Sequence, residues 1–294
     1  MKKQSFLPLL ALVGGMAAFV LRLLQNRTGF EAATGLPVSG NVPGLVLVAL
    51  LAVLALAFLL LVRRLPGETD PGPAFPAEFA AGNSGQVFLP VAGALLMLLS
   101  GLADLAEGLG GVNLLARLQA AADPYGAVAM ESVSGFAPKA QLLLGLLGLV
   151  SGAAVFLAAA ACRRGTRESE SSFQGTLLLV PPVALVVRLV LTYRLDSIDP
   201  ALEAYYVELL ALVFLTLGFY RLSSFAFQSG RTRRFALYAC AAVVLCIAAL
   251  ADGGPHLSSL LLYAGGAAAL LGFLLLRLAH VPGDCEVHDS TGDA

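Results

Sequence analysis

The chain has 294 residues, of which 58% are hydrophobic and only 13% are charged. Soluble domains average about 25% charged residues, so this composition excludes an ordinary water-soluble fold. The net charge of −1 and the dispersed basic residues exclude a basic binding face, and we expect no nucleic-acid partner.

The hydrophobic residues form eight runs that are separated by polar stretches. Each run approaches the roughly 20 apolar residues that a helix needs to cross a hydrocarbon core of about 30 Å. We therefore predict an all-α polytopic membrane helix bundle with about eight transmembrane helices. In chain order the predicted spans cover residues 6–25, 43–62, 86–106, 140–161, 174–193, 203–224, 234–252 and 257–278.

Two connections and the C-terminal tail need separate interpretation. Residues 63–85 are rich in proline and glycine and indicate a cytoplasmic linker without a core of its own. Residues 107–139 contain the amphipathic stretch NLLARLQAAA, which indicates either a short interfacial helix or a lid. The tail at 282–294 is polar, and we expect it to be a disordered cytoplasmic segment.

The basic residues predict the orientation of the chain. If the N-terminus is cytoplasmic, the inner segments carry twelve Lys and Arg residues and the outer segments five. Because cytoplasmic segments of membrane proteins carry an excess of Lys and Arg, both termini are predicted to be cytoplasmic.

Charged residues recur in the two halves of the chain. Alignment of the first span with the fifth matches Arg22 with Arg188, and alignment of the third with the seventh matches Asp104 with Asp252. Charges inside apolar runs are rare, so these matches predict a 4+4 parallel internal repeat about an axis along the membrane normal. Chance alignment of Leu/Ala-rich helices is the alternative. The predicted halves are residues 1–161 and 162–281.

Helix-breaking residues also lie at equivalent positions in the two halves. Gly14 and Gly15 are expected to interrupt the first span at the level where Pro181 and Pro182 interrupt the fifth. Interrupted helices at matching positions are typical of a binding site near the membrane midplane. Ordinary kinks and close helix packing are the alternative.

The charges inside the spans gather at one depth, in the predicted outer half. An unpaired charge there would cost several kcal/mol, so these side chains should face one another or a water-filled cavity. Arg188 and Glu208 lie on spans joined by a short turn and are the predicted pair. Structural ion pairs that fix packing are the alternative. The candidate substrate-binding residues are Arg188, Glu208, Arg22, Asp104 and Asp252.

Catalytic and metal-binding patterns are poorly represented. His256, His280 and His288 lie outside the predicted spans, so we expect neither an intramembrane zinc site nor a histidine base. The sequence contains no HExxH, G-x-S-x-G or phosphate-binding loop motif. We predict that the protein is not an enzyme and uses no metal or cofactor.

Four stretches of the region 173–254 form a recognisable pattern. They are RLVLTYRLDSIDP (Arg188–Pro200), YYVELLAL (Tyr205–Leu212), GFYRLSSFAF (Gly218–Phe227) and ALADG (Ala249–Gly253). With these residues the region resembles a group of uncharacterised multi-pass membrane proteins of Gram-positive anaerobic bacteria. The resemblance covers under a third of the chain. It implies an eight-span protein of the bacterial inner (cytoplasmic) membrane and carries no activity with it.

Three functions remain open at this point. The first is a small-molecule carrier, or a substrate-binding membrane subunit, whose outward-facing site binds a small polar or charged ligand. The second is a non-transporting sensor or assembly module, whose small-residue faces allow close helix approach within the fold or with a membrane-protein partner. The third, a lipid-modifying enzyme that uses Asp104 or Glu208, lacks a nucleophile. The small-residue faces comprise Gly145, Gly148 and Gly152 in the fourth span and Gly265, Ala269 and Gly272 in the eighth.

Overall fold

The computed structural model describes residues 6–29, 38, 40–65, 75–110, 138–164, 176–196, 202–252 and 256–280. Within these ranges the chain forms helices and no strand. Seven of the helices are long and apolar enough to cross a membrane, as a multi-pass membrane protein requires. The long helices are α1 (Phe6–Thr28), α2 (Val42–Arg63), α4 (Phe88–Gly110), α6 (Pro138–Arg164), α8 (Val180–Asp196), α9 (Leu202–Ala226), α10 (Thr232–Ala249) and α11 (Leu257–Ala279).

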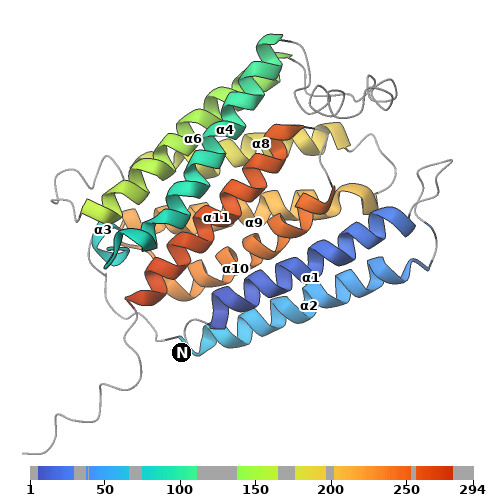
Figure 1. The fold of residues 1–294 in the computed structure, drawn as a ribbon, viewed down its shortest axis with the longest axis horizontal. Coiled ribbons are helices and arrows are strands. Elements are labelled where there is room, and N and C mark those ends of the chain that lie inside the picture. Colours follow the sequence, from blue (N-terminus) through green and yellow to red (C-terminus); the bar gives the residue numbers. More distant parts are fainter. Residues whose placement is uncertain are drawn as a thin grey trace, which may run out of the picture.

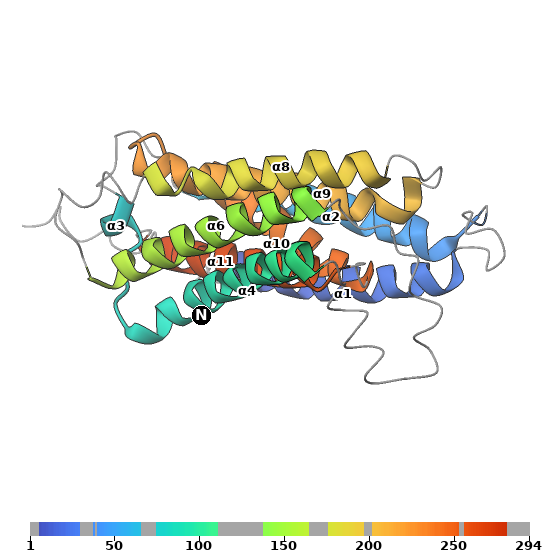
Figure 2. The same ribbon diagram turned by 90° about the horizontal axis from the view of Figure 1, so that it is seen from above.

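The helices form one bundle in which the last two helices are central. Figure 1 shows α1 and α2 along one edge, α4 and α6 along the opposite edge, and α10 and α11 between them. Figure 2 shows α8 along one side of this bundle. Accordingly, α11 is the most enclosed of the membrane-spanning helices and α2 the least. Three short elements complete the described chain: α3 (Phe75–Glu78), η2 (Ser84–Val87) and η4 (Leu250–Asp252).

The predicted spans agree with the helices to within a few residues, except at the start of the fifth. Helix α8 begins at Val180 rather than near residue 174, and a turn at residues 178–179 precedes it. Pro181 and Pro182 therefore lie in its first turn, where a missing backbone N–H costs nothing because those groups have no partner within the helix. The two prolines set the start of α8 and do not kink its middle.

The predicted interruption at Gly14 and Gly15 is wrong. Helix α1 runs without a break from Phe6 to Thr28. A Cβ atom at Gly14 would lie 2.8 Å from the side chain of Leu54 on α2, and one at Gly15 would lie 2.8 Å from Ile247 on α10. The two glycines thus allow neighbouring helices to approach α1 closely, which was the alternative interpretation.

Small residues bring α4 very close to both α6 and α11. A Cβ atom at Gly101 would lie 2.6 Å from the backbone nitrogen of Leu149 on α6. At Gly265 on α11 it would lie 2.8 Å from the carbonyl oxygen of Gly93 on α4. Such close backbone approach is how small residues stabilise helix pairs in a membrane. The small-residue faces of α6 and α11 are therefore used within the fold, against α4.

The connection 63–85, predicted to be a linker without a core of its own, packs into the core of the bundle with the part that the structure describes. Phe75 and Phe79 are buried at the end of the bundle where α2 and α6 end and α4 begins. The ring of Phe79 makes edge-on contacts with Phe225, Phe235 and Phe273, at centroid distances of 5.2, 6.0 and 5.9 Å. The α2–α4 connection thus inserts an aromatic anchor into the bundle.

Some predictions concern residues outside the described ranges. These are the amphipathic stretch within 111–137, the linker residues 66–74 and the tail 282–294.

Candidate functional site

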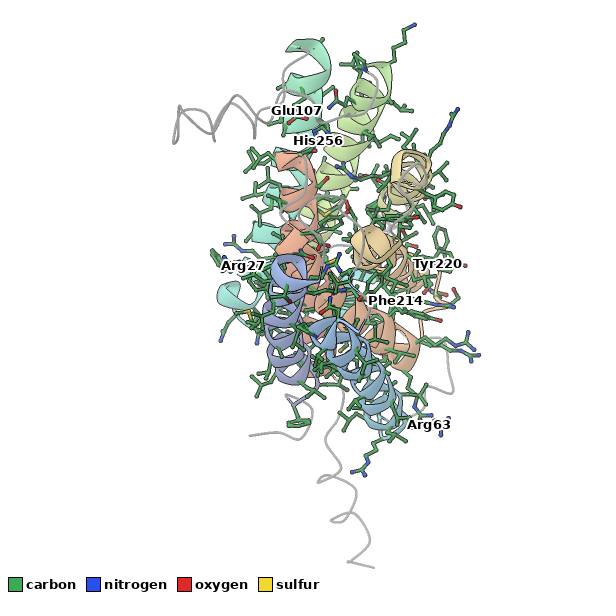
Figure 3. All side chains as sticks on the ribbon, turned by 90° about the vertical axis from the view of Figure 1, so that its right-hand side faces the viewer. Arg27, Arg63, Glu107, Phe214, Tyr220 and His256 are labelled. Carbon is green, nitrogen blue, oxygen red and sulfur yellow. The ribbon has the colours of Figure 1, made fainter. Side chains whose placement is uncertain are left out.

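Polar side chains gather at the end of the bundle where α1, α4, α8 and η4 end and α9 and α11 begin. This is the right-hand end in Figure 1, and it faces the viewer in Figure 3. Most of these side chains are buried. We call the group the polar cluster; its members are Arg22, Asp104, Glu107, Arg188, Glu208, Asp252, His256 and Tyr263.

Arg188, on α8, joins three helices through its guanidinium group. Its Nη1 donates to Oδ2 of Asp104 on α4 at 2.8 Å. Its Nη2 donates to the hydroxyl oxygens of Ser258 and Ser259 on α11, at 3.2 and 3.1 Å. Ser100 on α4 donates to the backbone carbonyl of Ser258 at 2.7 Å, which holds α4 and α11 together beside the ion pair. Arg188 is only 5% exposed, so this network is shielded from solvent.

Arg22, on α1, forms the second ion pair of the cluster. Its Nε lies 2.5 Å from Oδ1 of Asp252 at the end of η4, and its Nη1 donates to Oε1 of Gln25 at 3.0 Å. Asn26 donates to the same Asp252 oxygen at 2.9 Å. The guanidinium carbon also lies 5.3 Å from the ring centre of Tyr206 on α9, a cation–π distance. Arg22 thereby connects α1 with η4 and α9.

Glu107 and His256 form a third buried pair, next to each other in Figure 3. His256 Nδ1 lies 2.8 Å from Oε2 of Glu107, and Gln141 on α6 donates to that oxygen at 3.1 Å. His256 precedes its span as predicted, but its buried ring belongs to the cluster. The sequence interpretation, which set the histidines aside, missed this role.

Glu208, on α9, accepts a hydrogen bond from the hydroxyl of Tyr263 on α11 at 2.7 Å. The predicted ion pair between Arg188 and Glu208 is therefore wrong, because Arg188 pairs with Asp104. The two residues lie at the same end of neighbouring helices, yet their side chains engage different partners on α11.

Other polar members of the network were also missed. His256, Ser259 and Tyr263 are spaced three and four residues apart, which places them on one face of a helix. This polar stripe in an apolar run was the signal that the sequence offered.

Each of the two Arg–Asp ion pairs joins one predicted half of the chain to the other. Arg22 of residues 1–161 pairs with Asp252 of residues 162–281, and Arg188 of the second segment pairs with Asp104 of the first. The sequence alignment matched the two arginines with each other and the two aspartates with each other. The same Arg–Asp combination is thus used twice, with the contributing segments exchanged.

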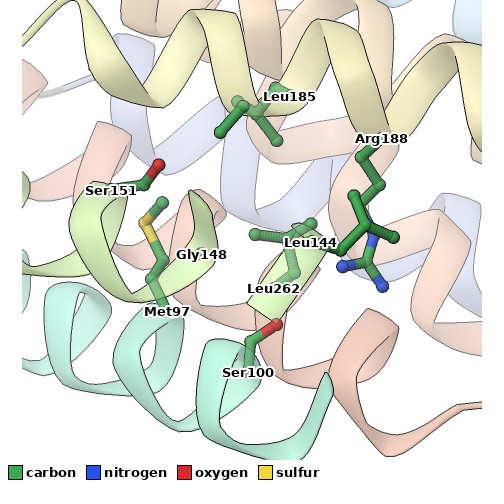
Figure 4. Close-up of a pocket in the computed structure, with 9 residues that line it drawn as sticks. Met97, Ser100, Leu144, Gly148, Ser151, Leu185, Arg188 and Leu262 are labelled. Atoms are coloured by element: carbon green, nitrogen blue, oxygen red, sulfur yellow. The ribbon is translucent and has the colours of Figure 1, made fainter. Parts of the chain in front are cut away.

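A small pocket lies beside Arg188, between α4, α6, α8 and α11 (Figure 4). Its volume of about 20 Å³ is room for about one water molecule. Ser100, Ser151 and Arg188 give it polar atoms, and its other walls are mainly apolar. Glu208, Arg22, Asp104 and Asp252 do not line it.

The cluster offers groups suited to the recognition of charged molecules. Within the described ranges, no group of three or more His, Cys, Asp or Glu side chains is placed to hold a metal ion. Guanidinium groups bind carboxylates or phosphates, while carboxylates bind protons, amines or small cations. Both kinds of group are concentrated here, and most of their side chains are buried.

Comparison of the chain with protein-family models, with curated proteins and with solved structures found no match. The resemblance of residues 173–254 to a bacterial membrane-protein group therefore stays a prediction. Function has to be inferred from the geometry of the polar cluster.

Proposed function

We propose that the protein is a carrier of a small polar or charged molecule, or the substrate-binding subunit of such a carrier, in the bacterial cytoplasmic membrane. The proposed substrate-binding residues are Arg188, Glu208, Arg22, Asp104 and Asp252. The observation that carries the proposal is the burial of two arginines, two carboxylates and His256, beside two half-buried carboxylates, at one end of an apolar bundle.

Stability alone does not account for these charges. Replacing a buried ion pair with well-packed apolar side chains is often neutral or stabilising, because the attraction between the charges barely offsets their desolvation. Ionisable side chains inside a membrane protein are therefore functional candidates by default. An apolar fold that only needed to pack its helices would do so with the small residues of α4, α6 and α11.

The arrangement of the ion pairs suits alternating access. Parallel repeats in transporters move as two bodies around a site between them. Both Arg–Asp pairs connect a helix of residues 1–161 with one of residues 162–281. Breaking and reforming these two contacts at one end of the bundle would open and close that end.

A non-transporting sensor or assembly module is the second candidate. The short, buried contacts of both arginines and the small volume of the pocket favour it, since a static framework needs neither space nor motion. The use of the small-residue faces within the fold removes its original support.

Uptake by proteoliposomes that contain the purified full chain tests the proposal. We expect accumulation of at least one solute from a panel of radiolabelled organic acids, amino acids and amines. R188A and E208A should abolish it, whereas R27A, which changes an exposed arginine on α1, should not. Wild-type rates in both R188A and E208A would show that the cluster is not the substrate site.

A further inference from the structure

Three arginines gather at the end of the bundle opposite the polar cluster, where α9 ends and α10 begins. Arg221 lies near the end of α9, and Arg231 and Arg234 lie at the start of α10. Arg231 and Arg234 are exposed, and Arg221 is half-buried. Tyr238 follows Arg234 by one turn on the same face of α10 and contacts Arg221 across the helix pair. The three positive charges therefore lie along one edge of α9 and α10.

The guanidinium of Arg221 is held between two tyrosine rings. Its Cζ atom lies 5.4 Å from the ring centre of Tyr220 and 5.6 Å from that of Tyr238, both cation–π distances. The side chain makes no hydrogen bond or ion pair among the described residues, and of its nitrogens only Nε is buried. The rings thus fix the position of the guanidinium, while its two Nη groups stay open to a ligand.

Other basic groups at this end do have acceptors within the fold. Arg233 donates to the backbone carbonyl of Leu65, and Arg277 donates to the hydroxyl of Thr232 at 2.8 Å. The acidic side chain that the described ranges place at this end is Glu78, which is buried and lies 3.9 Å from Arg277. The described chain therefore supplies no counter-charge for Arg221.

The depth of Arg221 and the surface next to it indicate where a counter-charge comes from. Arg221 lies about 7 Å along the axis from the last residue of α9, near the level of the lipid head groups. Phe214 and Leu210 lie two and three turns deeper on the same face of α9. Phe214 is half-buried against Tyr238, and Leu210 is 38% exposed. Figure 3 shows Phe214 and Tyr220 on the same side of the bundle.

A ligand that matches this surface has an anionic head and long apolar chains. The planar fork of an arginine binds phosphate oxygens through two parallel hydrogen bonds. Basic side chains at the ends of membrane helices attract anionic lipids in the same way. A zwitterionic lipid carries its own cation and leaves the charge of three arginines without compensation. A soluble anion would leave the apolar strip below them unused.

We propose that Arg221, Arg231 and Arg234 bind the phosphate group of an anionic phospholipid whose acyl chains lie along the face of α9 that carries Phe214. This lipid site goes beyond the proposed carrier function and does not depend on it, because Arg188 and the rest of the polar cluster lie at the other end of the bundle.

The chain contains no tryptophan, so F214W introduces a single fluorescent reporter. It lies about 10 Å deeper in the membrane than Arg221, at the depth of the acyl chains. The F214W chain is reconstituted in phosphatidylcholine vesicles that contain one brominated component, either phosphatidylglycerol or phosphatidylcholine, at the same mole fraction. Brominated phosphatidylglycerol should quench the tryptophan more strongly, with a binding preference of at least about fivefold over phosphatidylcholine.

Variants locate this preference. R221Q in the F214W chain should bring the preference close to one, and R234Q, which changes an exposed side chain, should lower it. R163Q is the matched control, because Arg163 is an exposed arginine at the same end of the bundle but on α6, along another edge. R163Q should keep the full preference. For the chain without the reporter, phosphatidylglycerol should raise the thermal midpoint in detergent more than phosphatidylcholine does.

Three results would overturn the inference. The first is equal quenching by the two brominated lipids together with equal thermal midpoints. The second is an equal loss of preference in R163Q and R221Q, which would show attraction to the general positive charge of this end. The third is loss of the preference on addition of glycerol 3-phosphate, which would assign the arginines to a soluble phosphate ester. Uptake measurements in the same vesicles test the carrier function independently.

Discussion

Arg22 illustrates what a charged side chain requires inside an apolar bundle. It is completely buried, and its contacts come from a carboxylate, an amide and an aromatic ring. The carboxylate of Asp252 is held in turn by Asn26. Removal of one member leaves the other charge desolvated and unpaired, which is the costly event at such a site.

We therefore predict that R22Q destabilises the protein by about 3–5 kcal/mol, the usual cost of breaking a buried ion pair. The double variant R22Q/D252N should recover most of that loss, because no unpaired charge remains. Thermal unfolding in detergent, followed by circular dichroism, measures both effects. Equal losses in the single and double variants would mean that Arg22 contributes through packing alone.

The sequence identified the charged residues of the site but not how they pair. The positions of Arg188 and Glu208 within their hydrophobic runs predict their depth in the membrane, and the two residues do lie at the same end of the bundle. The direction in which each side chain leaves its helix depends on the rotation of that helix, which the run lengths do not determine. Asp104, on a helix distant in sequence, lies where the guanidinium of Arg188 points.

At the scale of helices, glycine mainly allows the backbones of two helices to approach each other closely. Gly101 and Gly148 face each other across α4 and α6, and a Cβ atom at Gly148 would lie 3.0 Å from the Cα atom of Gly101. Backbones this close gain dispersion contacts that larger residues would prevent.

G101V should accordingly separate α4 from α6 and cost about 1–3 kcal/mol, the range for overpacked sites. G110V is the matched control, because a Cβ atom at Gly110, at the end of the same helix, has nothing within 4 Å. The thermal midpoints of the two variants in detergent provide the comparison. A G101V protein as stable as G110V would contradict tight α4–α6 packing.

The aromatic anchor in the α2–α4 connection shows where a prediction from composition fails. Proline and glycine dominate residues 63–85 and favour a linker, but Phe75 and Phe79 are large apolar residues that gain from burial. Arg233, at the start of α10, also donates to the backbone carbonyl of Leu65 at 2.7 Å. Two aromatic residues within a proline-rich connection were the signal of a segment that packs.

For the whole molecule, span lengths were the most predictable property, since membrane thickness dictates them. Helix α8 is the exception that affects topology. Its 17 residues extend about 25 Å, slightly less than a hydrocarbon core. Whether the chain crosses the membrane seven or eight times therefore depends on α8, and the side on which the C-terminus lies depends on the same helix.

We predict eight crossings, because the basic residues favour that orientation. Reporter fusions measure it directly: an odd number of crossings would place the C-terminus outside. Fusions after Arg64, Arg164 and Arg233 and at the C-terminus should be cytoplasmic, and those near Gly110, Asp196 and Gly254 external.

The central position of α10 and α11 has a consequence for how the protein is made. Asp252 follows Arg22 by 230 residues, and the serines that hold Arg188 follow it by about 70. During synthesis, Arg22 enters the membrane long before Asp252 exists, whereas Asp104, the carboxylate partner of Arg188, is already made when Arg188 appears. We therefore expect α1 to be held in the translocation machinery, or beside a chaperone that shields its charge, until Asp252 arrives. Interrupted translation would release a chain with exposed membrane charges, which quality-control proteases can recognise.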